Sequence, residues 1–412
     1  MDQSREWQAL ATHVGGLYHC ASCNYCVDMV WREQGIAGVC ATVRDHSRST
    51  AYTGKGYMAT ARALLEDAPL PLEAVAQSAW ACTTCGNCEA VCPIDLQPMQ
   101  VVKALRGELL QRGAIPPALA AVHESVTRHE NPYQAPREAR GDWALQLEPS
   151  GGEAVLLPGC DACHQLPGEA RAAAQLLMQA GEALAWPEGD FCCGAPLAML
   201  GDNEAGAARA AELTEAVAHS GARRLYSLGG PCLEQFAAAA TDLEVLHPLQ
   251  ALQARLDAGA LHLVPKRAAL PQRVGCVDAC HLCKPAHGLA DRGFDVAMRG
   301  LLQALGCEVV EPGAAPRYAV CCGAAGGMPQ LHPESATRMA LNRLGVLEQA
   351  GAQAIVSADP LCVAHLQAAQ RPEAPPVYGL LEFVAAYFEV STAPAAGSQD
   401  ADAGAGAPEH DT

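Results

Sequence analysis

The sequence is poor in aromatic and charged residues. Aromatic side chains make up 5% of its 412 residues and charged side chains 17%, whereas hydrophobic residues account for 50%. A chain of this length and apolar content can bury more than one core. Because alanine and glycine are abundant, closely packed α/β layers are favoured over an all-β sandwich.

Positive charge is also scarce. The formal net charge is -18, and no basic cluster offsets it. This balance argues against nucleic acid and against anionic lipid surfaces as partners. Since no run of 18 or more apolar residues is present, we expect no segment to span a membrane by itself. Any membrane association should come through a partner.

The N-terminal stretch "MDQSREWQALATH" has no basic segment followed by an apolar one, so we do not expect a secretory signal. A cytoplasmic location follows as an expectation, with peripheral attachment to the inner face of a membrane through a partner as an alternative. The twenty cysteines are far too many for ordinary cores. Without an oxidising compartment, metal binding or redox chemistry is favoured over disulfides.

The clearest motif is "ACTTCGNCEAVCPI", which has the C-x2-C-x2-C-x3-C-P spacing of bacterial ferredoxins. Three thiolates at this spacing can wrap one corner of a [4Fe-4S] cluster, and the backbone N-H groups between them can donate to its sulfurs. Zinc is the alternative, but it prefers two separated C-x2-C pairs.

A partner motif lies upstream in "HCASCNYCVDMVWREQGIAGVCATV". Its first three cysteines keep the spacing, but Cys40 follows Cys26 after thirteen residues rather than three, and "CAT" replaces "CP". In two-cluster ferredoxins the fourth cysteine of a run ligates the other cluster. This crossed pattern predicts one cluster on Cys20, Cys23, Cys26 and Cys92 and a second on Cys82, Cys85, Cys88 and Cys40. A [3Fe-4S] centre or a non-cysteine fourth ligand remains the alternative at the first site.

The second half of the chain contains an internal repeat. "LPGCDACH" matches "VGCVDACH", "FCCGAP" matches "VCCGAA", and "LYSLGGPCLEQF" matches "IVSADPLCVAHL". The Cys-Cys pairs are 129 residues apart (321 minus 192) and the last cysteines 130 apart (362 minus 232). The apolar runs "RRLYSL" and "QAIVSA" are expected to be strands, which places Cys232 and Cys362 in loops at their carboxyl ends, where open α/β sheets hold their sites.

These patterns predict a domain order. A helical, ferredoxin-like domain for two [4Fe-4S] clusters should occupy residues 1–112, followed by a connector rich in Pro, Gly and charge at 113–150. Two repeated Cys-Cys-Gly modules of the βαβ type should follow at 151–265 and 266–390. The acidic, low-complexity stretch 391–412 is expected to be disordered.

Together the motifs "PGC", "DACH", "FCCG" and "VCCGAAGG", with the connector "ENPYQAPREARGDW", resemble the cysteine-rich CCG-domain family. This family includes the iron-sulfur subunits of glycolate oxidase, the lactate-utilisation proteins, the cysteine-rich subunit of anaerobic glycerol-3-phosphate dehydrogenase, and subunits of heterodisulfide reductase. The resemblance covers nearly the whole chain. It does not identify the substrate, because the reacting substrate usually belongs to a flavoprotein partner.

The resemblance implies that the CCG repeats bind a further [4Fe-4S] or non-cubane cluster, or take part in disulfide chemistry. The family pattern often ends each repeat in C-x2-C, whereas Gly229 and Asp359 replace the first cysteine here. Four ligands per repeat remain rather than five, so the cluster type stays open. The implied sets are Cys160, Cys192, Cys193 and Cys232 in the first repeat, and Cys280, Cys321, Cys322 and Cys362 in the second.

Several residues near these sets have alternative interpretations. Cys163 could replace Cys160, although the resemblance favours Cys160, and either Cys276 or Cys283 could replace Cys280 or act as a redox thiol. Cys307 is expected to be a small buried hydrophobe. His164 and His281 are expected to cap or pack, with a ligand or proton-relay role as the alternative.

We therefore expect an iron-sulfur electron-transfer subunit. It should pass electrons between an FAD-containing 2-hydroxy-acid dehydrogenase, of the glycolate or lactate type, and a respiratory or other acceptor such as a membrane or quinone-linked partner. The sequence "GAAGGM" lacks the G-x-G-x-x-G spacing of a dinucleotide loop, so hydride chemistry should belong to the partner. The alternative is a catalytic subunit that reduces a disulfide or sulfur substrate at the CCG site. Whether the chain is itself an enzyme stays open, and no catalytic residue is assigned.

Overall fold

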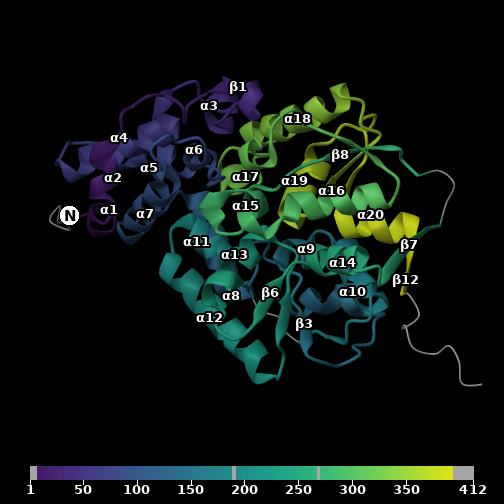
Figure 1. Cartoon of the computed structure of the whole chain (residues 1–412). Helices are drawn as coiled ribbons and strands as arrows, with labels where there is room; N and C mark the ends of the chain where they lie inside the picture. The colour runs from purple at the N-terminus through teal and green to yellow at the C-terminus, as the bar shows by residue number, and fades with distance from the viewer. Residues whose placement is uncertain (1–6, 188–191, 267–269, 393–412) are drawn as a thin grey trace, which may run out of the picture.

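A computed structural model of the chain describes residues 7–187, 192–266 and 270–392. Figure 1 shows the N-terminal helices gathered at one end, beside α11, α17 and α18 of the rest of the chain. The stretch expected to be disordered lies outside the described residues from 393 on. Its first two residues, Ser391 and Thr392, belong to strand β12 (Phe388–Thr392) instead, which corrects the prediction at these two positions.

The N-terminal part is mainly helical. Helix α4 begins where the Thr53 hydroxyl accepts the N-H of Gly56, and it buries Met58, Ala61 and Leu64 on one face. The helices are α1 (Gln8–Ala11), α2 (Val14–His19), α3 (Ala41–Asp45), α4 (Gly54–Leu65), α5 (Leu72–Trp80), α6 (Asn87–Ala90) and α7 (Pro98–Gln111), with 3-10 turns η1 (Arg32–Gln34) and η2 (Thr50–Tyr52).

One feature of this part is not foreseen by the sequence patterns. Strands β1 (Val30–Trp31) and β2 (Ile36–Ala37) form a short antiparallel hairpin inside the domain that the sequence predicts to be helical, so that domain is not purely helical. Two-residue strands carry no alternating pattern that a sequence could reveal.

The predicted connector is also structured. It contains helix α8 (Pro117–His129) and the 3-10 helix η3 (Glu138–Ala144). Pro117 stands at the first turn of α8, where its missing N-H costs nothing, and Leu119 and Val126 are buried. Since α8 packs on α11 and α17, this segment is part of the folded body rather than a bare linker.

The two repeats of the sequence are repeats of the fold. Each contains a four-stranded parallel sheet. The first sheet is formed by β3 (Ala154–Leu156), β4 (Leu184–Ala185), β5 (Arg224–Tyr226) and β6 (Glu244–Leu246). The second is formed by β8 (Arg273–Cys276), β9 (Glu308–Val310), β10 (Ala354–Ser357) and β11 (Val377–Gly379). Numbered by their order in the chain, the strands of each repeat lie side by side as 2-1-3-4, which is β4-β3-β5-β6 in the first sheet and β9-β8-β10-β11 in the second.

Helices cover both sheets. In the first repeat they are α9 (Cys160–His164), α10 (Pro167–Gln179), α11 (Ala195–Leu200), α12 (Asn203–His219), α13 (Gly230–Ala239) and α14 (Pro248–Asp257). In the second they are α15 (Cys280–Cys283), α16 (Phe294–Ala304), α17 (Met328–Leu331), α18 (Pro333–Gln349), α19 (Pro360–Ala369) and α20 (Leu380–Tyr387), with 3-10 turns η4 (Pro285–His287), η5 (Ala290–Arg292) and η6 (Pro316–Tyr318).

The repeats share one core and are tied at their ends. Leu156 and Leu225 of the first sheet belong to the same buried cluster as Val274 and Ile355 of the second. Strand β7 (Leu261–Pro265), which follows the first repeat, pairs antiparallel with β12 (Phe388–Thr392) at the end of the second. The buried carboxylate of Glu169 on α10 also accepts the first N-H groups of α20, which have no partner within that helix.

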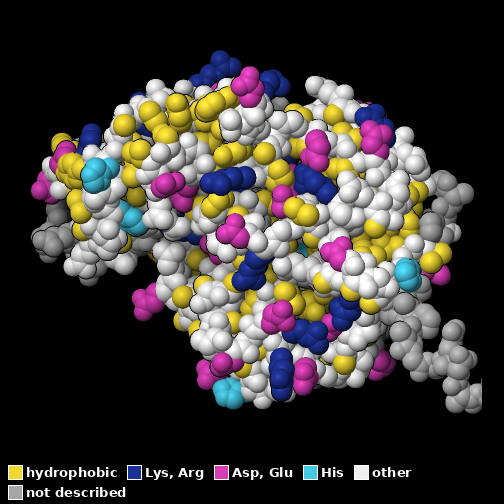
Figure 2. Space-filling model, viewed as in Figure 1, with side chains coloured by type: hydrophobic (Ala, Val, Ile, Leu, Met, Phe, Trp, Pro, Cys, Tyr) yellow, Lys and Arg dark blue, Asp and Glu magenta, His cyan; other side chains and the backbone are white. Residues whose placement is uncertain are grey.

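Charges of both signs are mixed on the surface. On the face shown in Figure 2, basic and acidic side chains are interspersed with hydrophobic ones, and no basic patch stands out. Among the described residues, no helix is long and apolar enough to cross a membrane.

Candidate iron-sulfur sites

The first thiol group lies near the surface of the N-terminal part. A cavity of about 80 Å³ is lined by the four cysteines of the first predicted set together with Cys88. Cys23 is exposed. The members of this set are Cys20, Cys23, Cys26 and Cys92. Cys92, predicted to cross over from the second ferredoxin run, therefore lies with the first.

The two cysteine runs share two left-handed backbone positions. In the first run Ser22 and Asn24 have positive φ angles of 53° and 70°, and in the second Thr84 and Gly86 have 51° and 74°. These residues hold equivalent positions between the first three cysteines of each run. The left-handed turns let successive thiols face one side, which an extended strand would not allow.

The second thiol group contains the other crossed ligand. Cys40 lies close enough to Cys82 and Cys85 for their charges to interact, and Cys88 interacts with the same two cysteines. Burial raises the pKa of Cys40 to about 12 and that of Cys82 to about 11. Thiolates at such positions need a compensating charge, which metal ligation supplies.

Buried cations beside this group fit an anionic cluster. Arg106 on α7 is fully buried, and its guanidinium donates to the carbonyl oxygens of Ala79, Cys82 and Met199. Lys284 is also fully buried, and its Nζ donates to Asn87 Oδ1 at 2.8 Å and to a carbonyl oxygen.

In the part of the chain that the structure describes, no carboxylate pairs with Arg106 or Lys284. An unpaired buried cation is costly. A [4Fe-4S] cluster on four thiolates carries the negative charge that would offset it, so the residues present fit this group.

In the first CCG repeat, thiols from three segments converge. The Sγ atoms of Cys193 and Cys232 are 3.0 Å apart, and Cys192 is hydrogen-bonded to Cys160 and to Cys193. All four are buried. Gly194 follows the pair with φ +80°, and a Cβ there would lie 2.2 Å from a backbone oxygen, so only glycine fits this turn.

The second CCG repeat has the same arrangement. Cys322 Sγ lies 3.3 Å from Cys362 Sγ, and Cys321 is hydrogen-bonded to Cys280. The bond from the Cys280 thiol holds the pKa of Cys321 below its ordinary value. Cys232 and Cys362 lie in the first turns of α13 and α19, which corrects the sequence-based prediction that placed them in the preceding loops.

The second CCG group adjoins the second ferredoxin-type group. Cys85 packs against the buried cluster that contains Cys280 and Cys321 and lies close enough to interact with both thiols, and Cys321 also interacts with Cys82. No sequence signal points to this contact, because Cys280 and Cys321 lie 195 and 236 residues after Cys85 (280 minus 85 and 321 minus 85). It joins two sites that the motifs present as independent.

A cavity of about 90 Å³ is lined by residues of the first CCG group and of the second repeat. Cys160, Cys193 and Cys232 line it together with residues 324–327 of "GAAGG", Tyr133 and Asp161. The Tyr133 hydroxyl donates to the Asp161 carboxylate. A Cβ on Gly326 would lie 2.4 Å from the carbonyl oxygen of Cys82. The loop therefore packs directly on the second ferredoxin run.

The remaining cysteines lie elsewhere. Cys163 and Cys307 pack in the shared core of the repeats, and Cys276 and Cys283 lie near Asp278 rather than with the second CCG group. All twenty cysteines belong to the described residues, and none of them forms a disulfide there. The geometry thus groups Cys160 and Cys280, not their neighbours, with the other thiols of each set. Which of them ligate iron stays a prediction.

Two family models match the chain. A "4Fe-4S dicluster domain" matches residues 16–96, and a "Cysteine-rich domain" of the CCG type matches residues 154–237 and again 274–367. The chain belongs to the CCG-domain iron-sulfur family. It is therefore an iron-sulfur protein with two [4Fe-4S] clusters in its N-terminal part. The match of both repeats to the cysteine-rich domain supports further iron-sulfur clusters.

Its relatives are named as parts of redox complexes. The chain is 26% identical over 320 residues to a subunit of the dihydromethanophenazine:CoB-CoM heterodisulfide reductase of Methanosarcina barkeri, covering 73% of this chain and 75% of the relative. It is 23% identical over 307 residues to a subunit of the fumarate reductase (CoM/CoB) of Methanothermobacter marburgensis, covering 71% and 58%. A probable membrane-anchored ferredoxin of Chromohalobacter salexigens is 28% identical over 357 residues, covering 78% and 49%. The latter two relatives are thus considerably longer than the region they share with this chain.

Proposed function

We propose that this CCG-family protein is the electron-transfer subunit of an oxidoreductase complex. Electrons would pass between the surface cluster on Cys20, Cys23, Cys26 and Cys92 and the second cluster, and from there to the second CCG site. The observation that carries this proposal is the contact of Cys85 with Cys280 and Cys321, because it makes the ferredoxin-type and CCG sulfur groups continuous.

The exposed Cys23 supports a partner that exchanges electrons at the surface. The partner we propose is an FAD-containing dehydrogenase of a 2-hydroxy acid such as glycolate or lactate, because this chain has no sequence motif for binding a flavin or nicotinamide. The other terminus would be a membrane or quinone-linked acceptor. A relative named as membrane-anchored supports that part of the proposal.

A second function is favoured by the cavity beside the first CCG group. Thiols of Cys160, Cys193 and Cys232 line it, and a relative is named as a heterodisulfide reductase subunit. In this alternative the chain would reduce a disulfide there, adding two electrons and two protons to give two thiols.

Metal analysis of single variants tests the sites. Two [4Fe-4S] clusters alone give about eight iron atoms per chain, and a cluster in the second repeat adds about four. If that repeat holds a cluster, Cys280→Ser should remove about four iron atoms. Cys283→Ser is the matched control, since Cys283 is also buried, lies three residues on and stands apart from the other thiols. Equal losses in both variants would contradict the assignment.

Anaerobic purification from the native source tests the function. The proposal predicts that a flavoprotein copurifies and that its 2-hydroxy acid bleaches the visible absorbance of the clusters. If no flavoprotein copurifies and the isolated chain reduces a disulfide with a viologen donor, the alternative is correct.

A further inference from the structure

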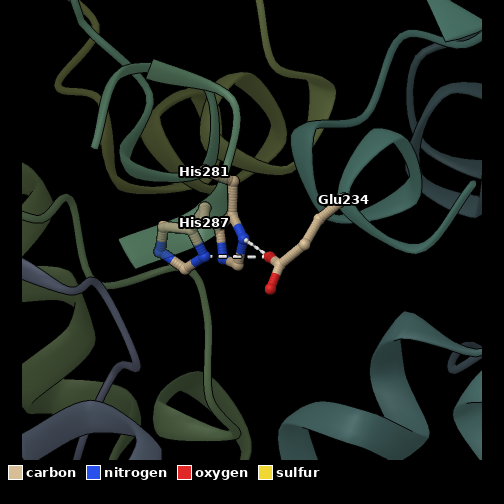
Figure 3. A group of neighbouring side chains, drawn as sticks. All are labelled: Glu234, His281 and His287. Carbon is tan, nitrogen blue, oxygen red and sulfur yellow. Dashed lines mark hydrogen bonds and ion pairs between the residues drawn. The ribbon is translucent and has the colours of Figure 1, made fainter. Parts of the chain in front are cut away.

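Three parts of the chain meet at a cluster of two histidines and one glutamate. Glu234 lies on α13 of the first repeat, whereas His281 lies on α15 and His287 at the end of η4, both in the second repeat. Figure 3 shows both rings turned toward the carboxylate. The N-terminal part contributes Lys103 of α7, which bonds the other carboxylate oxygen, and Gly86, which lies against His287.

The geometry of this cluster brings three donor atoms together. The Nδ1 atoms of His281 and His287 lie 2.9 and 2.8 Å from Glu234 Oε2, and all three lie within 4.8 Å of one another. Both histidines are 4% exposed, whereas the Glu234 side chain is 18% exposed. The site is therefore enclosed on the imidazole side and reachable from solvent at the carboxylate.

Hydrogen bonding alone satisfies this group poorly. A single carboxylate oxygen serves two imidazoles, and the Nε2 atoms of both His281 and His287 are buried without a partner among the described residues. Each buried imidazole thus has one nitrogen bonded, and that nitrogen, Nδ1, is the one that faces Glu234. Two imidazoles and a carboxylate are, however, a donor set that holds Zn²⁺ in proteins, with a further position left for water.

The Lys103 ammonium completes the arrangement. Its Nζ lies 3.1 Å from Glu234 Oε1, so it fixes the carboxylate through the oxygen that does not face the histidines. Ligating carboxylates in metal sites are commonly held in this way by a neighbouring donor. Lys103 therefore orients the group without occupying the space between the three donor atoms.

We propose that Glu234, His281 and His287 bind one divalent cation of the Zn²⁺ class through Glu234 Oε2 and the two Nδ1 atoms. The site contains none of the cysteines assigned to the clusters. Its ligands come from both repeats, so the cation would join α13 to α15 and η4. This inference goes beyond the proposed function and does not depend on it.

A matched control exists within the same chain. His46 and His332 form a second pair of adjacent, tilted rings, with ring centroids 4.1 Å apart against 4.0 Å for His281 and His287. His332 Nε2 is likewise buried without a partner, but among the described residues no carboxylate bonds either ring of this pair. A metal specific to the proposed site should not depend on His332.

The test is a zinc measurement on the full chain with its clusters loaded. The protein is purified anaerobically, supplied with iron and sulfide, exposed to Zn²⁺ and dialysed against a weak chelator. We expect about one zinc per chain, and X-ray absorption at the zinc edge should show nitrogen and oxygen neighbours at about 2.0 to 2.1 Å without a sulfur shell at about 2.3 Å.

Variants then locate the metal. His287→Gln and Glu234→Gln should each lower bound zinc at least tenfold with unchanged iron content, whereas His332→Gln should retain it. Lys103→Met keeps every ligand and should weaken zinc affinity about 10-fold to 100-fold. If a ligand variant does not fold, this weakening is the result that supports the site. No retained zinc, a shell of sulfur neighbours, or equal zinc loss in His332→Gln would overturn the proposal.

Discussion

Lys284 should raise the reduction potential of the second ferredoxin-type cluster. Its ammonium is fully buried, donates to Asn87 Oδ1 and has no carboxylate partner among the described residues. Asn87 stands between Cys85 and Cys88, and Lys284 also interacts with the Cys280 thiol. Because reduction adds one negative charge to the cluster, a fixed positive charge beside it stabilises the reduced state.

The size of the effect follows from Coulomb's law. A unit charge at about 8 Å in an effective dielectric of about 20 contributes about 2 kcal/mol. Since about 1.4 kcal/mol corresponds to a factor of ten, or about 59 mV for one electron, this equals about 90 mV. Lys284→Met removes the charge and keeps the length of the side chain, so we expect the potential to fall by several tens of mV up to about 90 mV.

The assay is an anaerobic redox titration followed by EPR, with each cluster resolved by its signal. Lys284→Arg, which keeps the charge, should restore most of the potential. Lys55→Met is the control near the first cluster, because Lys55 is a lysine that lines that cavity and bonds Asn24 at the surface. Loss of the Lys55 charge should change the reduction potential of the second cluster little, since solvent screens that surface charge. A Lys284→Met potential within about 10 mV of the parent would refute the reasoning, as would equal shifts of both clusters.

Two further predictions concern stability. Burial lowers the pKa of His247 to about 4, from 6.5 in the unfolded chain. As the pH falls, the unfolded state therefore binds a proton before the folded state does. The free energy of unfolding should decrease by up to about 3 kcal/mol as the pH drops from 6.5 toward 4. His247→Gln should flatten this part of the thermal unfolding profile, and an unchanged slope would contradict the assignment. Gly194→Ala should destabilise the chain by about 2 kcal/mol or more, because φ is +80° and the new Cβ would meet the Gly206 carbonyl. Gly345→Ala, inside α18 with open space around it, should instead stabilise by about 0.5 to 1 kcal/mol in the same unfolding measurement; loss of stability in both would count against this explanation.

Short-range features of the sites can be predicted from the sequence. Three cysteines spaced by two residues can hold one object only if the backbone turns between them, and the left-handed residues Ser22 and Thr84 provide that turn in both runs. The spacing of the Cys-Cys pairs likewise reveals the repeat, because the same sheet order is built twice. Both patterns lie within one module, where sequence distance and spatial distance agree.

Features that depend on an ambiguous local signal or on packing between modules cannot be predicted in this way. Helix α8 is hidden in the predicted connector because Pro116 and Pro117 resemble helix breakers, although proline at the first turn begins a helix. The cluster of Glu234, His281 and His287 is hidden because its members come from different repeats. The sequence motif therefore presents His281 only as a capping or packing residue, or as an isolated ligand or relay.

The adjacent cysteines of each CCG turn face different partners, and both repeats use the pair in the same way. Cys192 bonds Cys160 and Cys193 bonds Cys232, so the pair joins the two ends of the first repeat. The second repeat uses the same arrangement, with Cys321 near Cys280 and Cys322 near Cys362.

The two repeats then differ in what lies beyond the pair. Cys321 also contacts Cys85 of the ferredoxin run, whereas Cys193 and Cys232 line a cavity. A repeat in contact with another cluster suits a relay, and a repeat open to a cavity suits a terminus. If electrons do leave the chain at a CCG site, the first repeat is therefore where a small substrate or acceptor should be sought.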